Sequence, residues 1–386
     1  MSGRRVFFYV QHLLGIGHQR RAATLTRAMQ AAGLEVTFVS GGHRIPGLDL
    51  AGARLVQLPA TRAVDLYFKK LVDEHDRPID DAWRADRRAR LLAAYEACRP
   101  HVVILELFPF GRRQMRFELM PLLERAAAEV PRPAIVSSVR DILVEPPKPE
   151  RLSEMLDLVE RRFDHVLVHG DPALIPFDAT FPHAREIADR LHYTGYVVDR
   201  TGSADETGDG AGEVVVSAGG GAVGERLLAT AIAARPLTRL AGRTWRVLVG
   251  VKVEDAVFER LRAEAPEGVI VERARGDFPS LLMRCALSIS QAGYNTVMES
   301  LHAGCRAVVV PYAGGLETEQ TLRAGLLAKR GLLTVLPEDA LSPERLAAAV
   351  EQALDRPGGR AGGLQTDGAE VTARLVAGWA AGVDRP

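Results

Sequence analysis

Short apolar runs alternate with helix-like segments along almost the whole chain, and this alternation most constrains the fold. Between the runs, apolar residues recur every three or four positions, as on the buried face of a helix. The clearest runs are residues 4–10, 35–40, 101–107, 133–138 and 165–169, and then 213–218, 245–250, 269–272, 286–290, 307–311 and 332–336. Near-continuous apolar strands separated by helices indicate parallel sheets covered on both faces.

The organisation into domains follows from the length and from one change of character. A chain of 386 residues is too long for one ordinary core. Residues 199–212, "DRTGSADETGDGAG", are small, polar and glycine-rich, which is typical of a linker. We therefore expect an α/β protein with two doubly wound, Rossmann-like domains facing a cleft. The expected parts are residues 1–198, the linker 199–212, residues 213–366, and a C-terminal helix within 367–386 that packs back on the first domain.

Composition excludes several classes of protein. Hydrophobic content of 47% and charged content of 25% are typical of a soluble globular protein. Lys+Arg and Asp+Glu both number 49, so no nucleic-acid partner is expected. Cys98, Cys285 and Cys305 lie far apart without CxxC spacing, which argues against a zinc site or a disulfide framework and suits a cytoplasmic location.

The most informative motif is "SISQAGYNTVMES" in the second half. A buried strand leads through a glycine turn into a helix, where free N–H groups and the helix dipole favour a diphosphate. Gly293 lets a ligand approach the backbone. Thr296 and Glu299 share one face of the helix, and a carboxylate there can accept hydrogen bonds from two ribose hydroxyls. Thr-x-x-Glu is also the pattern of a capping box, which needs no ligand, and the local sequence leaves both interpretations open.

A second junction of the same kind follows. Gly304 ends the helix, "RAVVVP" is an expected strand, and Glu319 and Gln320 stand at the start of the next helix. Alone, this pair is equally typical of a solvated helix N-terminus. Two polar junctions in succession favour a ligand site.

Together these junctions resemble the donor half of GT-B glycosyltransferases. They are most similar to the family of the peptidoglycan N-acetylglucosaminyltransferase that forms lipid II. That family has Ser-x-x-Gly-x-x-Thr-x-x-Glu, matched here from Ser290 to Glu299, and then Pro-aromatic, matched by Pro311 and Tyr312. The resemblance implies that Glu299 holds the ribose and that Glu319 and Gln320 contact the donor sugar. The family has two glutamines at the latter positions, so the identity of the sugar stays open.

Two further loops take donor roles by the same resemblance. Gly219, Gly220 and Gly221 precede a helix and are expected to contact the diphosphate, although such turns also serve tight packing. Arg273 and Ala274 match the place where the family's backbone reads the uracil edge; otherwise they form an ordinary loop. The full set of expected donor-binding residues is Gly17, Gly219, Gly220, Gly221, Arg273, Ala274, Ser290, Gly293, Tyr294, Asn295, Thr296, Glu299, Glu319 and Gln320.

The first half supplies the expected catalytic and acceptor residues. Gly17-His18 opens the first helix, as a Gly-His pair does in the family, and His18 is the expected general base. We expect its place at a helix N-terminus to lower its pKa. Glu106 and Asp141, which follow strands, are candidates to orient it, although Asp141 also suits a helix cap or a surface ion pair.

Two arginines are candidates to hold an anion on the acceptor. Arg112, beside Arg113 in "ELFPFGRR", and Arg140 follow strands of the first half. For Arg112 and Arg113 a solvated face is an equal alternative.

The resulting hypothesis is an inverting glycosyltransferase that uses a nucleotide sugar, with uridine favoured by resemblance. No metal or other cofactor is expected, because Asp80-Asp81 lies in a charged helical stretch rather than at a strand end. The acceptor is open: a small molecule, a glycan or a lipid-linked group, the last with peripheral membrane contact. The alternatives are a nucleotide-sugar epimerase and a non-catalytic nucleotide-sugar-binding subunit. A dehydrogenase is disfavoured, because "GIGHQR" lacks the third glycine of G-x-G-x-x-G.

Overall fold

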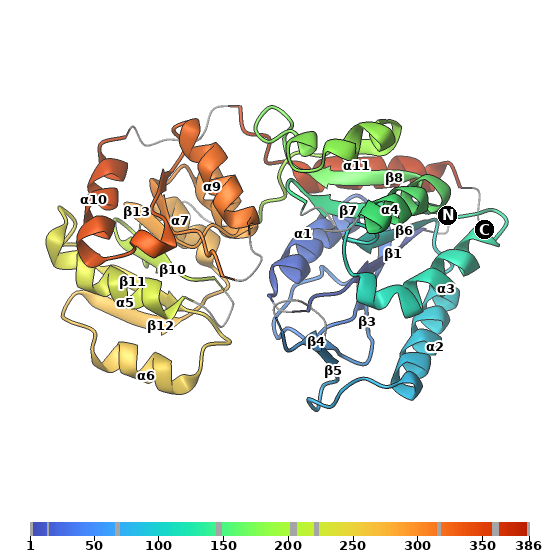
Figure 1. The fold of residues 1–386 in the computed structure, drawn as a ribbon, viewed down its shortest axis with the longest axis horizontal. Helices are drawn as coiled ribbons and strands as arrows, with labels where there is room; N and C mark the ends of the chain where they lie inside the picture. The colour runs from blue at the N-terminus through green and yellow to red at the C-terminus, as the bar shows by residue number, and fades with distance from the viewer. Residues whose placement is uncertain are drawn as a thin grey trace. The chain divides into compact units, whose positions relative to one another are not determined.

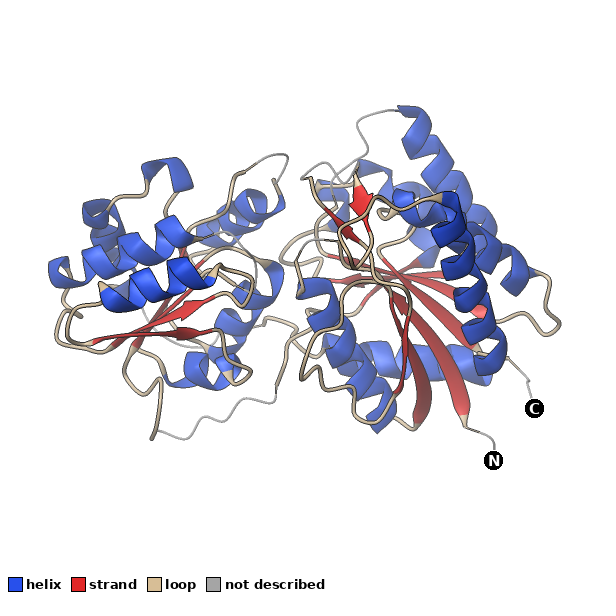
Figure 2. Ribbon diagram, turned by 90° about the horizontal axis from the view of Figure 1, so that it is seen from below, coloured by secondary structure: helices blue, strands red, loops and turns tan. Residues whose placement is uncertain are grey.

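The computed structural model describes residues 3–13, 15–65, 70–143, 149–200, 207–219, 224–314, 318–356 and 363–383. The chain divides into two compact units, of which the first holds residues 1–197 and 367–386 and the second holds residues 198–366. Each unit is a parallel sheet with helices on both faces (Figure 2). This arrangement confirms the Rossmann-like architecture that the alternation predicts.

The sheet of the first unit has the strand order β3-β2-β1-β6-β7-β8-β9, and all its neighbouring strands run parallel. Its strands are β1 (Arg4–Val10), β2 (Leu34–Ser40), β3 (Arg54–Gln57), β6 (Val102–Glu106), β7 (Ala134–Arg140), β8 (His165–His169) and β9 (Leu191–Tyr193). The order reverses between β1 and β6. In open α/β sheets such a reversal opens a crevice at the carboxyl ends of the strands, where ligands bind.

Helices cover both faces of this sheet and explain why its strands are apolar throughout. The α-helices are α1 (Gly17–Ala31), α2 (Asp81–Cys98), α3 (Arg116–Ala127), α4 (Pro149–Arg162) and α11 (Gly368–Ala381). Phe7 and Tyr9 of β1 enter the core under α2, α3 and α4, whereas Val6, Phe8 and Val10 enter the core under α1 and α11. Short elements complete the unit: β4 (Arg62–Ala63), β5 (Leu71–Val72), and the 3₁₀ helices η1 (Arg113–Met115), η2 (Phe177–Ala179) and η3 (Pro182–Arg190).

The chain leaves the first unit and returns to it through one paired segment. Val197 and Asp367 form an antiparallel bridge. The backbones are so close that a Cβ added to Gly368 would lie 2.5 Å from the carbonyl oxygen of Gly195. From there α11 packs against α1 (Figure 1).

The second unit repeats the architecture with the strand order β12-β11-β10-β13-β14-β15. Its strands are β10 (Val214–Ser217), β11 (Trp245–Val249), β12 (Val269–Arg273), β13 (Leu287–Ser290), β14 (Ala307–Val309) and β15 (Thr334–Val335). Its helices are α5 (Glu225–Ala234), α6 (Asp255–Ala263), α7 (Phe278–Arg284), α8 (Tyr294–Ala303), α9 (Glu319–Lys329) and α10 (Pro343–Leu354), with the 3₁₀ turns η4 (Arg235–Leu237) and η5 (Glu338–Ala340). Here the order reverses between β10 and β13.

The described end of the expected linker is held against the second unit. Asp209 forms ion pairs with Arg246 and Arg275, at 3.0 Å and 2.5 Å. The Gly212 N–H donates to the carbonyl of Arg284 at 3.0 Å. Residues 207–212 therefore belong to the body of this unit rather than to a free tether.

A buried ion pair joins α2 to α3 beneath the first sheet. The side chains of Arg87 and Glu118 are both 0% exposed, and Arg87 Nε donates to Glu118 Oε2 at 2.8 Å. The Tyr9 hydroxyl donates to Glu118 Oε1 at 2.5 Å, and Arg87 also donates to the carbonyl of Gly41 at 2.8 Å. A buried charge is tolerated only when it is paired and hydrogen-bonded in this way.

We predict that Glu118→Gln lowers the free energy of unfolding of the first unit by about 3–5 kcal/mol, because it leaves the Arg87 charge buried without its counter-charge. Native-state hydrogen exchange of the β1 amides measures this change. Asp81→Asn, which breaks the ion pair of a 99% exposed Asp81 side chain with Arg84, is the control and should change little. A loss from Glu118→Gln no larger than that of the control would contradict the prediction.

Candidate active site

The first unit brings His18, Glu106 and Arg21 together where its strand order reverses. His18 and Arg21 lie in the first turns of α1, which follows β1, and Glu106 is the last residue of β6. The His18 Nδ1 lies 2.6 Å from Glu106 Oε1, and Arg21 donates to the same oxygen at 2.5 Å. The side chains of Glu106 and Arg21 are 1% and 2% exposed, whereas that of His18 is 16% exposed and can meet a ligand.

The charges around this pair fix its protonation. The pKa of His18 is lowered from 6.5 to about 4: burial is the largest cause, Glu106 opposes it, and the charges of Arg112 and Arg140 add to it. Burial by itself would raise the pKa of Glu106, but His18, Arg21 and Arg112 outweigh it and bring the pKa to about 2. At neutral pH the imidazole is neutral and the carboxylate is ionised. The Nδ1–H of His18 then donates to Glu106, and Nε2 keeps a lone pair that can accept a proton.

The pKa of His18 is lowered, as predicted, but the predicted cause was the helix N-terminus. Burial is the main cause instead. Glu106 makes the contact expected of an orienting carboxylate. Its second oxygen, Oε2, is buried and has no hydrogen-bond partner among the described residues.

Asp141 directly follows β7 and is 0% exposed, which rules out the surface ion pair considered for it. It sits under Gly170, where an added Cβ would lie 2.8 Å from Asp141 Cβ. Its expected role beside His18 stays a prediction.

The expected acceptor-binding arginines lie near the same cluster. Arg112 is half-buried with a left-handed backbone, φ 59°, and its Nε donates to the carbonyl of Gln11 at 2.7 Å. Burial lowers the pKa of Arg112, and the nearby charges of Arg140 and Arg21 lower it further, against the opposing effect of Glu106. Arg113, by contrast, is exposed and forms an ion pair with Glu154. The solvated alternative therefore holds for Arg113 and fails for Arg112.

Two groups near the cluster were missed by the sequence-based reasoning. Arg21 lies three residues after His18 on the same helix face, a spacing that could have indicated it. Behind the cluster, His169 lies 2.8 Å from the Ser138 hydroxyl and 2.9 Å from that of Thr194. All three are buried, and burial lowers the pKa of His169 well below its ordinary value. This chain of hydrogen bonds supports the ends of β7 and β8 but is closed to a substrate.

In the second unit, the start of α8 lies where the strand order reverses, directly after β13. Gly293 is the N-cap residue, with φ −63°, and an added Cβ there would meet no atom within 4 Å. Open space in front of the backbone, rather than a strained conformation, is what glycine provides here. Ser290 is 1% exposed, and its hydroxyl has no hydrogen-bond partner among the described residues.

The position of this N-cap excludes the capping-box alternative. A capping box needs Thr296 at the N-cap, but the helix begins at Tyr294, and Thr296 lies inside its first turn. Thr296 and Glu299 are both half-buried. Asn295 lies between Tyr294 and Thr296 in the same turn.

The second polar junction is engaged with its own unit. Glu319 is 6% exposed and forms an ion pair with Arg323, at 2.6 Å, and the Arg323 guanidinium lies 5.3 Å from the centre of the Tyr294 ring. The Gln320 side-chain oxygen accepts from the Tyr312 N–H at 3.2 Å. The solvated alternative for Glu319 is therefore wrong, whereas contact of this pair with a sugar stays a prediction.

The remaining donor candidates differ in what their positions permit. The Arg273 guanidinium donates to the carbonyl of Val253 at 2.8 Å and lies over the Phe258 ring, so it braces a loop. The Ala274 N–H is already used by the carbonyl of Val249, at 2.8 Å. Gly219 has a left-handed backbone, φ +75°, that favours glycine. Gly17 begins α1 and is exposed. Gly220 and Gly221 lie outside the described residues.

Two further features of the described residues concern the requirements of a metal site and of a membrane-spanning helix. Within the described ranges, no three His, Cys, Asp or Glu side chains are grouped as a metal site would require. Asp80 instead caps α2 by accepting from the Trp83 N–H at 2.7 Å. None of the described helices is long and apolar enough to cross a membrane.

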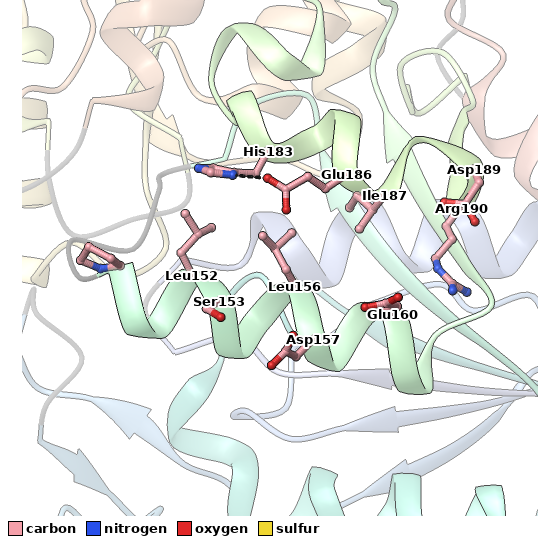
Figure 3. Close-up of a pocket in the computed structure, with 11 residues that line it drawn as sticks. Leu152, Ser153, Leu156, Asp157, Glu160, His183, Glu186, Ile187, Asp189 and Arg190 are labelled. Atoms are coloured by element: carbon pink, nitrogen blue, oxygen red, sulfur yellow. Dashed lines mark hydrogen bonds and ion pairs between the residues drawn. The ribbon is translucent and has the colours of Figure 1, made fainter.

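A cavity of about 560 Å³ lies between α4 and η3 in the first unit. Its lining residues belong neither to the His18 cluster nor to the start of α8. Figure 3 shows His183 and Glu186 of η3 facing Leu152 and Leu156 of α4 across it. No residue predicted for the site lines this cavity.

Comparison with known proteins adds a relationship for the second unit. Residues 272–360 match the model of the glycosyltransferase family 28 C-terminal domain. Two curated relatives are named UDP-N-acetylglucosamine–N-acetylmuramyl-(pentapeptide) pyrophosphoryl-undecaprenol N-acetylglucosamine transferase. The one from Mesorhizobium japonicum is 36% identical over 120 residues, which cover 30% of this chain and 32% of the relative. The one from Rhodopseudomonas palustris is 30% identical over 172 residues, which cover 41% and 45%. The chain thus spans less than half the length of these relatives.

Solved structures resemble the whole chain. The calicheamicin glycosyltransferase CalG4 superposes with a TM-score of 0.60 at 17% identity and covers 99% of this chain and 95% of its own. MurG of Acinetobacter baumannii superposes with a TM-score of 0.56 at 16% identity and covers 98% and 99%. The chain therefore has the GT-B fold of these glycosyltransferases; residues 272–360 match the C-terminal domain of glycosyltransferase family 28, and part of the chain is related to the lipid II-forming N-acetylglucosaminyltransferases.

Proposed function

We propose that this protein is a glycosyltransferase that moves a sugar from a nucleotide sugar to an acceptor hydroxyl, with inversion and without a metal. The observation that carries the proposal is the His18–Glu106 pair where the first sheet reverses its strand order. It holds a neutral imidazole by Nδ1 and leaves Nε2 able to accept a proton. Deprotonating an acceptor alcohol requires such a group.

The donor is assigned to the second unit. The start of α8 offers the Gly293 backbone, the Ser290 hydroxyl and a helix dipole to a diphosphate. Glu299, within the first two turns, is assigned to the ribose hydroxyls. Uridine is the favoured base, because the related enzymes are named for UDP-N-acetylglucosamine.

The reaction balances with these groups alone. The acceptor oxygen forms a bond to the anomeric carbon as the bond from that carbon to the diphosphate oxygen breaks. The attacking oxygen becomes strongly acidic as its new bond forms, so a base with a pKa of about 4 suffices, and its proton passes to His18 Nε2. The resulting imidazolium is paired with Glu106. The nucleoside diphosphate leaves with the electron pair, and N–H donors at the start of α8 stabilise its charge without a metal.

The acceptor is assigned to the first unit. Arg112 and Arg140, whose charges already act on His18, would attract an anionic group of that acceptor. A lipid-linked acceptor would bring a cytoplasmic enzyme to the membrane surface, as a peripheral protein.

Donor binding is predicted to stabilise the fold. In a thermal-shift screen of nucleoside diphosphates with EDTA present throughout, UDP should raise the melting temperature, since saturating ligand at about 100 times Kd adds about 2.7 kcal/mol to the free energy of unfolding.

Glu299→Gln should weaken UDP binding roughly 10- to 100-fold, as expected for a lost charge-assisted hydrogen bond. Glu264→Gln on the exposed end of α6 is the matched control. Undiminished binding by Glu299→Gln would remove the ribose assignment, and a divalent-ion requirement would remove the metal-free mechanism.

His18 is predicted to titrate near pH 4. Its pKa is lower in the folded protein than in the unfolded chain, so the unfolded state binds more protons between about pH 4 and 6.5, and the stability that it contributes is lost as pH falls through that window. NMR titration of the imidazole measures its pKa. Glu106→Gln should lower the pKa further, because Glu106 opposes the shift. Titration near 6.5 in the folded protein would show that the imidazole is not held as the structure has it.

Removal of the base is predicted to slow chemistry without affecting the donor. His18→Gln should reduce the rate of UDP release from a UDP-sugar, with water as the acceptor, by roughly 10²–10⁴-fold, the usual contribution of a general base, with UDP affinity unchanged. His75→Gln, at an exposed histidine of the same unit, is the control. If His18→Gln releases UDP as fast as the control does, His18 is not the base.

A further inference from the structure

A second cavity of the first unit, of about 350 Å³, lies beside the helix that carries His18. It is lined by α1, the end of β2, and the segment from Arg44 to Gln57. Its lining is more apolar than polar: Phe38 of β2, Leu48, Leu50 and Leu55 lie beside the polar side chains of Gln19, Ser40, Arg44 and Gln57. Of the lining residues only Arg44 is charged, and Leu55 remains 41% exposed. Such a lining suits an apolar group better than a sugar or a phosphate.

One buried polar group lines this cavity with an unmet hydrogen-bonding capacity. Gln19 is 1% exposed, and its Nε2 donates to the Ser40 hydroxyl at 3.0 Å. Its Oε1 is buried and has no hydrogen-bond partner among the described residues. An unpaired buried acceptor carries a free-energy penalty that a donor group of a ligand would relieve.

The cavity is pre-formed rather than a gap between mobile loops. The Gln57 side chain donates to the carbonyls of Ser40, Gly42 and Leu58, at 3.1, 2.8 and 2.9 Å. The bonds to Ser40 and Gly42 tie β3 to the end of β2 and the turn that follows it. A site that is already shaped costs a ligand little ordering.

The cavity lies within reach of the base. Gln19 follows His18 directly on α1, and Ser40 ends β2 as Glu106 ends β6. Only β1 separates these two strands, and neighbouring strands lie about 4.8 Å apart, so the strand ends that carry Ser40, in the cavity lining, and Glu106, the partner of His18, are about 10 Å apart. One acceptor molecule of modest size can span that distance.

We infer that this cavity binds an apolar part of the acceptor, with a hydroxyl or amide N–H of that part donating to Gln19 Oε1. The identification of the ligand as the acceptor rests on the proposed transferase function. The binding of an apolar group in this cavity does not. A compact ring system that carries a hydroxyl and a short isoprenoid alcohol share this chemistry.

The test uses the whole protein without nucleotide and three probes: 2-naphthol, 2-methoxynaphthalene, which lacks the donor hydroxyl, and geraniol. Dissociation constants come from ligand-observed NMR. We expect 2-naphthol or geraniol to bind below about 1 mM, and 2-naphthol to bind several-fold tighter than its methyl ether, as one neutral hydrogen bond allows. Tighter binding of 2-naphthol identifies a ring-bearing acceptor, and tighter binding of geraniol an isoprenoid one.

Two variants place the binding in this cavity. Gln19→Leu should abolish the preference for 2-naphthol over its methyl ether, and Leu55→Trp, at a partly exposed position that tolerates a larger side chain, should weaken every probe. Gln352→Leu and Leu237→Trp, at exposed sites of the second unit, are the matched controls. Absence of binding, or a hydroxyl preference that survives Gln19→Leu, overturns the inference and leaves the transferase proposal standing. Binding here without stabilisation by any nucleoside diphosphate would instead remove the transferase proposal.

Discussion

The buried carboxylate of Glu106 is the group on which the site of the first unit depends. A carboxylate that is 1% exposed stays ionised only when cations and hydrogen-bond donors surround it, and Arg21 and His18 fill that role from one helix. In return, the carboxylate fixes which nitrogen of His18 carries the proton. The strand-order reversal between β1 and β6 is what makes the meeting possible, since the start of α1 and the end of β6 face each other there.

The second unit uses the same architecture for a different purpose. The reversal between β10 and β13 leaves the start of α8 open, with glycine and serine rather than charged side chains at its mouth. The nearby charged residues are paired with each other: Arg323, in its ion pair with Glu319, packs against the Tyr294 ring and so supports the first turn of α8. Under the proposed function the two units have complementary roles: the first supplies a proton acceptor, and the second supplies a helix start for the diphosphate.

Both sheets were predictable because strands buried on two faces must be apolar throughout, as β1 and β6 are. His18 and Glu106 could be singled out because Glu106 ends a strand and His18 opens the helix that follows one, which are the places where ligands bind in such sheets. Arg21 could not be found with equal ease, because arginine on a helix is usually solvated and only packing against β6 shows otherwise. For the same reason the Arg87–Glu118 pair is invisible in the sequence. The sequence left the capping box open because the two interpretations differ only in whether Gly293 or Thr296 is the N-cap of α8. This difference of three residues is within the usual error of locating helix ends from sequence.

The central claim is that a neutral His18, held by Glu106, takes the proton of the acceptor. The pH dependence of kcat/KM for sugar transfer tests it most directly, since this profile reports the pKa of the essential base in the free enzyme. The account predicts a rate that is level through neutral pH and falls only as pH drops through about 4, where His18 becomes protonated. A fall centred near pH 6.5 would contradict it, because the essential base would then titrate as an imidazole in water does.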